Sequence, residues 1–342
     1  MVPPVPLHAP RALPTTWSPA WSPITVPHEH SLLRGARVGG RADHGRAAPA
    51  VGLPRLAGSP RAVEARPARR GLTAPPRVRR SSRCRLVGGV GYVVAVAEVV
   101  FRKLDELTDD EVYAAYAPPE PDWLRVNFVA SADGAATLEG LSGPLSGAED
   151  KRVFKVLRAR CDVLLAGSGT VRAEGYGPLV LSAERMAWRR SQGLPEVPVM
   201  AIATRTASLD PASGIFTEAP RRPILICPAD LPDSRVEPFR EVADVVAVGT
   251  GAVDYAAAVA ALRERGLRQI LCEGGPHVFG DLIAAGLADE LDVTISPKLV
   301  GAGPMRIAEG APAEEATPLR LRHVLEAGGN LILRYVRGSS DE

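Results

Sequence analysis

Two glycine-rich turns in this sequence are of a kind that brings the protein backbone close to an anion. One turn spans residues 167–170 (Gly-Ser-Gly-Thr) after the apolar run 162–167, and the other spans residues 273–276 (Glu-Gly-Gly-Pro) after the apolar run 269–272. Glycine leaves room for the approach, and a helix that starts there presents free N–H groups and the positive end of its dipole. Each turn alone also fits a plain tight turn. Together, on one sheet edge, they predict a site for the phosphates of a dinucleotide.

Two further turns carry a cation and a carboxylate. Thr204-Arg205 follows the apolar run 198–203, and an arginine fork beside a hydroxyl matches the oxygens of a phosphate, such as the ribose 2′-phosphate of NADPH. Asp133 stands in the turn 131–134, where its carboxylate can accept hydrogen bonds from the N–H groups of a pyrimidine. The alternative interpretations are a solvated loop arginine and an ordinary Asp-Gly turn.

Other kinds of chemistry lack their residues in this sequence. No G-x-G-x-x-G opens a helix after a strand with an acid about 20 residues further on, so the Rossmann fingerprint is missing. Beyond residue 90 the histidines are His277 and His323, and neither belongs to a recognisable Ser-His-Asp or Cys-His motif. The four cysteines form no C-x-x-C pair, so neither a disulfide framework nor a metal site is expected. Cys161, Cys227 and Cys272 lie within or beside apolar runs, which predicts buried reduced thiols.

Strands that alternate with helices must position these turns. Apolar and β-branched runs predict strands at residues 123–130, 162–167, 198–204, 223–227, 244–248, 269–272, 291–296, 319–325 and 330–337. Helices are expected after an S-x-x-E capping box at residues 146–149, at residues 254–265, and from Pro276 to Gly286. The pattern predicts an α/β fold with a mixed sheet flanked by helices, closed by a C-terminal β-hairpin across residues 326–329.

The first 90 residues differ in composition from the rest. They hold 15 Arg, no Lys and three acids, a charge of +12, and because the whole chain is +2 the remaining residues carry −10. A stretch rich in Arg, Pro and Ala cannot bury a core, so we expect residues 1–95 to be disordered. Three interpretations compete: an upstream extension with no folded role, for which a wrongly chosen start codon is one explanation, a transit peptide, and an arm that contacts nucleic acid or a membrane surface. With no long apolar run or secretory signal, a cytoplasmic protein without a membrane span is expected.

Four segments, taken in order, resemble the C-terminal reductase domain of the bifunctional riboflavin-biosynthesis deaminase–reductase family. They are NFVASADGAAT (127–137), LRARCDVLLAGSGTVRAEGYGP (157–178), ILCEGGPHVFGDLIAAGLADEL (270–291) and ISPKLVGAGP (295–304). The resemblance covers about residues 122–337 and implies a dihydrofolate-reductase-like fold for a domain of residues 98–338. It also implies NADPH as cofactor, a homodimer, and reduction of a ribosylamino-pyrimidine phosphate to its ribitylamino form. Hydride would pass from nicotinamide C4 to the imine carbon of the opened sugar.

The resemblance also assigns individual residues to the two ligands. The cofactor side comprises Gly167, Gly169, Thr170, Thr204, Arg205, Glu273, Gly274 and Gly275. The substrate side comprises Asn127, Ser131, Asp133, Arg172 and Glu174, with Asp133 as the candidate catalytic group. Such a reaction needs positioning and a dry site more than a nucleophile.

The sequence departs from the family pattern in two places. The H-x-E…P-C-x-x-C zinc signature of the deaminase domain does not occur in residues 1–120, so the chain is not expected to deaminate. Glu174-Gly175-Tyr176 replaces the acidic pair of the family's T-V-R-A-D-D-P segment, which leaves the natural substrate open. Three functions therefore compete: a pyrimidine reductase, a dihydrofolate- or pteridine-type reductase, and a nucleotide-binding protein without turnover. Hydride transfer from NADPH to candidate substrates separates them.

Overall fold

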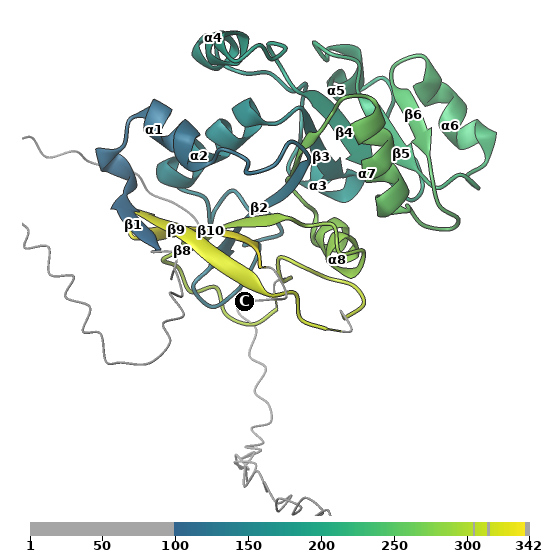
Figure 1. Ribbon diagram of the computed structural model, residues 1–342. Coiled ribbons are helices and arrows are strands. Elements are labelled where there is room, and N and C mark those ends of the chain that lie inside the picture. Colours follow the sequence, from purple (N-terminus) through teal and green to yellow (C-terminus); the bar gives the residue numbers. More distant parts are fainter. Residues whose placement is uncertain (1–98, 304, 313–314, 339–342) are drawn as a thin grey trace, which may run out of the picture. The chain divides into compact units, whose positions relative to one another are not determined.

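The structure is a computed structural model that describes residues 99–338, except 304, 313 and 314 (Figure 1). The predicted disordered extension, residues 1–95, lies outside the described residues. Within them a ten-stranded sheet has the order β1-β9-β10-β8-β2-β7-β3-β4-β5-β6. Its strands are β1 (Val100–Lys103), β2 (Trp123–Ser131), β3 (Val163–Gly167), β4 (Val199–Ala203), β5 (Ile224–Cys227), β6 (Asp244–Ala247), β7 (Gln269–Cys272), β8 (Glu290–Ser296), β9 (Leu319–Ala327) and β10 (Asn330–Arg337).

The sheet is mixed, as the sequence predicts. Strands β8, β2, β7, β3, β4, β5 and β6 pair in parallel, whereas β10 pairs antiparallel with β8 and with β9. The C-terminal hairpin is confirmed, but its turn is shorter than expected: β9 extends to Ala327, and Gly328 and Gly329 alone form the turn, with φ of 58° and 80°. Two consecutive residues at positive φ match the twist of the flanking strands, and glycine adopts that conformation without strain.

The helices are α1 (Asp109–Ala115), α2 (Ala148–Arg160), α3 (Ser168–Ala173), α4 (Ala183–Ser191), α5 (Gly214–Thr217), α6 (Asp233–Arg240), α7 (Tyr255–Glu264) and α8 (Pro276–Ala284). Pro276 opens α8 as predicted, since proline needs no N–H partner at that position. The predicted capping box at residues 146–149 is wrong. The N-cap of α2 is Gly147, and the Ser146 hydroxyl donates instead to the Asp150 carboxylate one turn into the helix.

Alternating side chains of the sheet face two separate cores. Leu164 and Ala166 of β3 pack into a core that includes buried residues of α1, α2 and α6, whereas Val163 and Leu165 pack with α7 and α8. Figure 1 shows α1 and α2 on one side of the sheet and α8 on the other. The central strands are thus covered on both faces, which explains their unbroken apolar runs. No described helix is long and apolar enough to cross a membrane.

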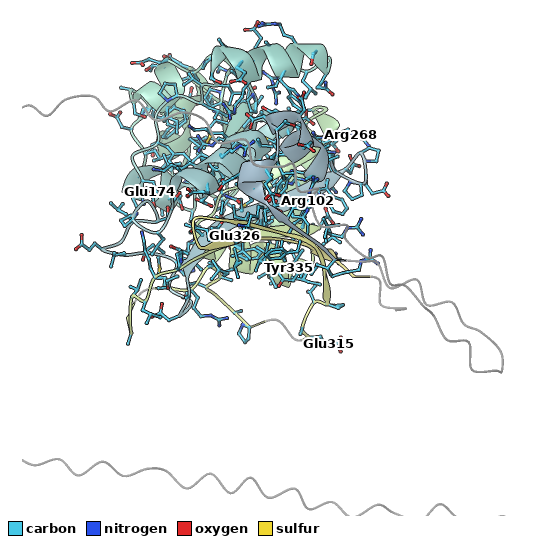
Figure 2. All side chains as sticks on the ribbon, turned by 90° about the vertical axis from the view of Figure 1, so that its left-hand side faces the viewer. Arg102, Glu174, Arg268, Glu315, Glu326 and Tyr335 are labelled. Atoms are coloured by element: carbon cyan, nitrogen blue, oxygen red, sulfur yellow. The ribbon has the colours of Figure 1, made fainter. Side chains whose placement is uncertain are left out.

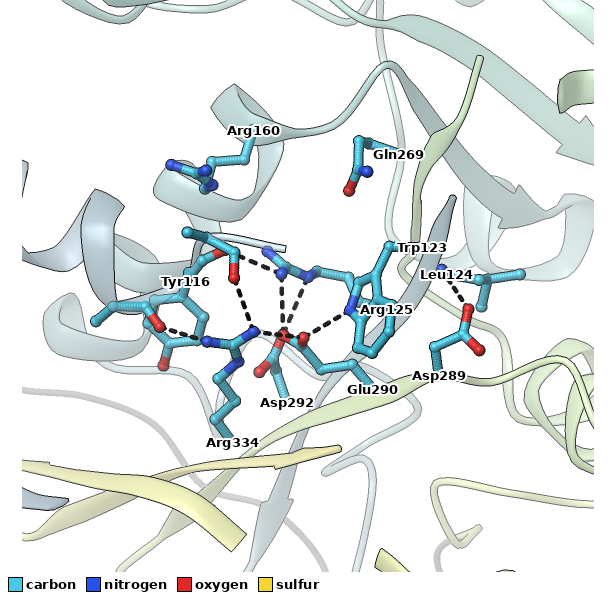
Figure 3. A network of polar contacts seen from close by, with 12 residues as sticks. Tyr116, Trp123, Leu124, Arg125, Arg160, Gln269, Asp289, Glu290, Asp292 and Arg334 are labelled. Carbon is cyan, nitrogen blue, oxygen red and sulfur yellow. Dashed lines mark hydrogen bonds and ion pairs between the residues drawn. The ribbon is translucent and has the colours of Figure 1, made fainter. Parts of the chain in front are cut away.

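A buried ionic network joins β2, β8 and β10 (Figure 3). The Glu290 carboxylate receives Arg125 Nη2 at 3.0 Å, Arg334 Nη2 at 2.8 Å and Trp123 Nε1 at 2.7 Å. Both arginines also donate to backbone carbonyls at the end of α1 and just beyond it. Burial favours a neutral Glu290, but the two arginines outweigh it and lower the pKa of Glu290. Burial and the charge of Glu290 raise the pKa of Asp292 well above its usual range.

Candidate functional site

Both glycine turns lie at the carboxyl edge of the sheet, on neighbouring strands. β7 pairs with β2 on one side and β3 on the other, so the turns after β3 and β7 meet. Gly167 N–H donates to the Gly274 carbonyl at 2.7 Å, and Glu273 N–H donates to the Leu165 carbonyl at 3.0 Å. Figure 2 shows Glu174, which follows α3, on the left of the molecule and Arg268, which precedes β7, on the right. The carboxyl ends of parallel strands are where open α/β sheets bind ligands.

A cavity of about 1000 Å³ opens at this edge. Its lining includes most of the residues that the sequence assigns to the two ligands: Asn127, Gly167, Gly169, Thr170, Arg172, Glu174, Thr204, Arg205, Glu273 and Gly275. Ser131, Asp133 and Gly274 are not among the lining residues. A volume of this size falls in the range of sites for cofactors and small molecules.

The glycines of the two turns serve different purposes. A Cβ on Gly275 would lie 2.7 Å from Thr170 Oγ1, and a Cβ on Gly167 would lie 2.9 Å from Val278 Cγ2, so these glycines let the turns pack together. Gly274 has φ of 99°, and a Cβ there would lie 3.1 Å from the Phe128 ring. A Cβ on Gly169, in contrast, would meet no atom within 4 Å. Gly169 alone of these four therefore borders open space that a ligand can fill.

The turn after β4 carries Arg205, and Arg172 of α3 reaches the same turn. Thr204 is buried, and its hydroxyl accepts the N–H groups of Thr206 at 3.4 Å and Ala207 at 3.1 Å, which fixes the turn. The exposed Arg205 side chain makes no hydrogen bond or ion pair with another described residue. Arg172 Nη1 donates to Ser208 Oγ at 3.3 Å, which places this predicted substrate residue beside the β4 turn instead. Both arginines line the cavity.

A tightly bonded cluster at the cavity wall escaped the sequence analysis; we call Phe154, Arg158, Tyr176 and Glu273 the Glu273 cluster. Arg158 donates from Nε and Nη2 to the two carboxylate oxygens of Glu273, at 2.7 and 2.6 Å. Tyr176 Oη donates to Glu273 Oε2 at 2.8 Å, and the Arg158 guanidinium lies 4.2 Å from the centre of the Phe154 ring. The spacing Phe154-x-x-x-Arg158, which puts both side chains on one helix face, was the available signal.

Asp133 and Ser131 lie outside the cavity wall and bond to each other. The Asp133 carboxylate accepts Ser131 Oγ–H at 2.5 Å and the N–H groups of Val300 at 3.0 Å and Gly301 at 2.7 Å. These bonds, from Ser131 first and then from the backbone, lower the pKa of Asp133. The carboxylate therefore anchors the segment after β8, which brings Met305 to the cavity. The catalytic assignment of Asp133 stays a prediction, and its observed contacts are with this loop.

Three other polar side chains complete the surroundings. Glu174 Oε1 accepts the N–H of Ser142 at 2.8 Å, which ties the segment after α3 to the loop after β2. Asn127 is half-buried on β2 and lines the cavity. Lys151 at the start of α2 also lines it, is exposed, and has no ionic partner among the described residues. Within residues 99–338, leaving aside 304, 313 and 314, no group of three His, Cys, Asp or Glu side chains is placed to hold a metal ion.

Comparisons with known proteins agree with the resemblance found in the sequence. A relative from Methanothermobacter thermautotrophicus, named 2,5-diamino-6-ribosylamino-4(3H)-pyrimidinone 5′-phosphate reductase, is 29% identical over 219 residues, which are 62% of this chain and 97% of that protein. A protein of the same name from Archaeoglobus fulgidus is 28% identical over 180 residues, or 52% of this chain and 82% of that one.

The solved structure of a pyrimidine reductase-like protein from Corynebacterium diphtheriae shares the fold. It matches with a TM-score of 0.63 and 24% identity, over 68% of this chain and 100% of that one. The family model described as the RibD C-terminal domain matches residues 122–333, more than half of the sequence. The chain therefore belongs to the family of the RibD C-terminal domain.

Proposed function

We propose that this chain is an NADPH-dependent reductase of a ribosylamino-pyrimidine phosphate, of the riboflavin-biosynthesis type. The observation that carries the proposal is one cavity lined both by the glycine turns with two arginines and by other polar and aromatic side chains. The curated relatives that match almost over their full length are named as reductases of such a pyrimidine. A cavity of about 1000 Å³ with both kinds of lining suits a dinucleotide and a heterocycle bound together.

The residues present fit NADPH. Gly169 borders open space beside Thr170, where a pyrophosphate can approach the backbone, and Arg205 offers a guanidinium with no partner among the described residues. We assign Arg172 to the cofactor as well because it bonds to Ser208 in the β4 turn. NADPH would supply the hydride. The chain itself would orient the two ligands and exclude water from the space between them.

We assign Asn127, Phe154, Arg158 and Tyr176 to the substrate, with Lys151 available for the substrate phosphate. We also move Glu273 from the cofactor side to the substrate side, because its carboxylate is bonded to Arg158 and Tyr176. The proposed reaction needs no side-chain nucleophile, because NADPH would supply the hydride. By the same family argument we propose a cytoplasmic homodimer, which light scattering of the purified protein would test. The thiols of Cys161, Cys227 and Cys272 are free and buried, which suits a reducing compartment.

The test is an assay of the purified chain with NADPH and three substrates, followed by the loss of NADPH absorbance. The substrates are 2,5-diamino-6-ribosylamino-4(3H)-pyrimidinone 5′-phosphate, 5-amino-6-(5-phosphoribosylamino)uracil and dihydrofolate. We expect turnover of at least one of the two pyrimidines and none of dihydrofolate. Turnover of dihydrofolate alone would transfer the chain to the pteridine reductases, and binding of NADPH without any turnover would leave a nucleotide-binding protein.

Gly169→Val is expected to weaken NADPH binding by at least about tenfold while the protein stays folded. The new side chain would occupy the open space beside Thr170 without meeting any protein atom, so the loss would come from blocking the cofactor. Ala260→Val, at an exposed position of α7 outside the cavity wall, is the control. Fluorescence titration with NADPH and circular dichroism decide: unchanged affinity in Gly169→Val would remove this turn from the cofactor site. Gly274→Val is a poorer test, because the positive φ and the Phe128 contact would strain the fold.

Asp133→Asn is expected to lower kcat/KM for the pyrimidine by about tenfold and leave NADPH affinity unchanged. Asparagine keeps the size of the side chain but loses the charge that three donors share, so the segment that carries Met305 would lose its anchor. Ser131→Ala should produce a smaller change in the same direction, because it removes one of those donors. Steady-state kinetics together with a cofactor titration check this, and normal kinetics for Asp133→Asn would exclude a functional role.

A further inference from the structure

The Glu273 carboxylate forms its hydrogen bonds with neighbouring side chains of the same protein. Its side chain is 2% exposed, and its carboxylate receives three hydrogen bonds, two from Arg158 and one from Tyr176. The donors come from different parts of the chain, α2 and the segment after α3, while Glu273 follows β7. A carboxylate so fully occupied has little capacity left for a ligand. We therefore expect Glu273 to influence ligand binding by positioning the side chains of Arg158 and Tyr176.

The hydrogen bond to Glu273 determines whether the Tyr176 hydroxyl can donate to a ligand or only accept from it. An ionised carboxylate only accepts hydrogen bonds, so the tyrosine hydroxyl must donate its proton to Glu273. Burial and then the negative charge of Glu273 raise the pKa of Tyr176, so the hydroxyl stays neutral. Tyr176 lines the cavity, and with its proton committed its oxygen can act there only as an acceptor.

Arg158 offers the opposite chemistry at the same place. Its Nε and Nη2 bond to Glu273, whereas Nη1 makes no hydrogen bond within the described residues. Arg158 also lines the cavity, and its guanidinium packs over Phe154. Arg158 Nη2 and Tyr176 Oη bond to the same atom, Glu273 Oε2, at 2.6 and 2.8 Å, and the Arg158 guanidinium lies 5.5 Å from the centre of the Tyr176 ring, so the two side chains are neighbours.

We propose that Tyr176 and Arg158 together read one edge of the substrate heterocycle and that Glu273 is the positioning residue for both. Tyr176 Oη accepts a hydrogen bond from a ring N–H or an exocyclic amino group, and Arg158 Nη1 donates to the adjacent ring carbonyl or ring nitrogen. The inference rests on the proposed function, because it needs the heterocycle to bind beside Tyr176 and Arg158. It also gives a role to Tyr176, which stands in the segment where the sequence departs from the family pattern.

The first experiment is a calorimetric titration of Tyr176→Phe with the two pyrimidine substrates in the absence of NADPH. Phenylalanine keeps the ring but removes the acceptor, so we expect the pyrimidine Kd to rise at least about tenfold while the NADPH Kd changes less than about twofold. In the assay, the loss should appear in KM more than in kcat. Tyr335→Phe, on β10 and outside the cavity wall, removes a matched hydroxyl and should bind both ligands like the wild type.

The second experiment tests the positioning role. In Glu273→Gln the side-chain amide can donate a hydrogen bond to the Tyr176 oxygen. The tyrosine hydroxyl is then free to donate its proton to a ligand and is no longer restricted to accepting. Adding Tyr176→Phe to Glu273→Gln should then cost much less pyrimidine affinity than it costs in the wild type. Equal, additive losses would show that Glu273 does not act through Tyr176 and would overturn the positioning role.

The outcomes separate this inference from the proposed function. If Tyr176→Phe weakens pyrimidine binding but the wild type oxidises no NADPH, the proposed function is wrong and the roles of Tyr176 and Arg158 in substrate binding are supported. If the wild type turns over a pyrimidine and Tyr176→Phe leaves the pyrimidine Kd unchanged, the proposed function is supported and the role of Tyr176 is wrong. A wild-type protein that binds neither pyrimidine would overturn both.

Discussion

A Glu290→Gln variant is expected to lose roughly 3–5 kcal/mol of unfolding free energy, a large share of the stability of an ordinary domain. The Glu290 side chain is fully buried and holds two arginines whose own side chains are nearly so, at 3.0 Å and 2.8 Å. Glutamine has nearly the same size but carries no charge. Arg125 would then keep only its contact of 3.7 Å with Asp292, and Arg334 would lose its ion pair with Glu290, so two buried positive charges would lose their main compensation.

Thermal unfolding measures this loss. For a body of this length, a loss of 1 kcal/mol lowers Tm by about 2–4 °C, so a fall on the order of 10 °C is expected. Glu237→Gln is the control, because it breaks an exposed pair with Arg240 at 3.0 Å whose side chains are 71% and 52% exposed. Such surface pairs contribute about 0–1 kcal/mol. Equal Tm values for the two variants would contradict the idea that burial of the network makes Glu290 important.

The network also has a pH signature. The folded pKa of Glu290 is lowered, so this group stabilises the fold at pH values above its ordinary pKa, and the contribution disappears as the pH falls through the folded value. Asp292 acts in the opposite sense, because its folded pKa is raised and stability is lost as the pH rises above its ordinary value. Comparison of wild type with Glu290→Gln across pH should therefore show a stability difference that narrows toward acid.

Arg205→Ala is expected to weaken NADPH binding about ten- to hundredfold and to leave NADH binding unchanged. One charge-assisted contact to a phosphate contributes about 1.5–3 kcal/mol, and NADH lacks the 2′-phosphate that we assign to this side chain. Arg205 is suited to the role because its side chain is exposed at the cavity wall and forms no hydrogen bond with another described residue.

Parallel titrations with NADPH and NADH check this prediction. Arg265→Ala removes the same charge at the end of α7, outside the cavity wall, and controls for the change in net charge. An equal loss of affinity for both cofactors in Arg205→Ala would move the residue away from the 2′-phosphate. If NADPH discrimination survives intact, Arg172 becomes the next candidate, because it reaches the same turn through Ser208.

The sequence by itself determined the elements and the local chemistry of the turns. Apolar runs such as residues 162–167 predicted strands, and β3 is buried along its whole length. The glycines at 274–275 and 328–329 marked turns because the constraints that glycine relieves act over a few residues. The order of these pieces also carried the family resemblance, and with it the expected cofactor side of the site.

Only the tertiary structure decided which of these pieces meet. Periodicity reports that a strand is buried but does not name its neighbours, so the pairing of β7 with both β2 and β3 was not readable in advance. Arg158 and Glu273 are 115 residues apart in sequence, and no local pattern links them. Asp133 had the right chemistry for a ligand, yet its hydrogen bonds go to Val300 and Gly301. Charged side chains bond with whatever the fold brings within reach, and that is fixed by the packing of the whole sheet.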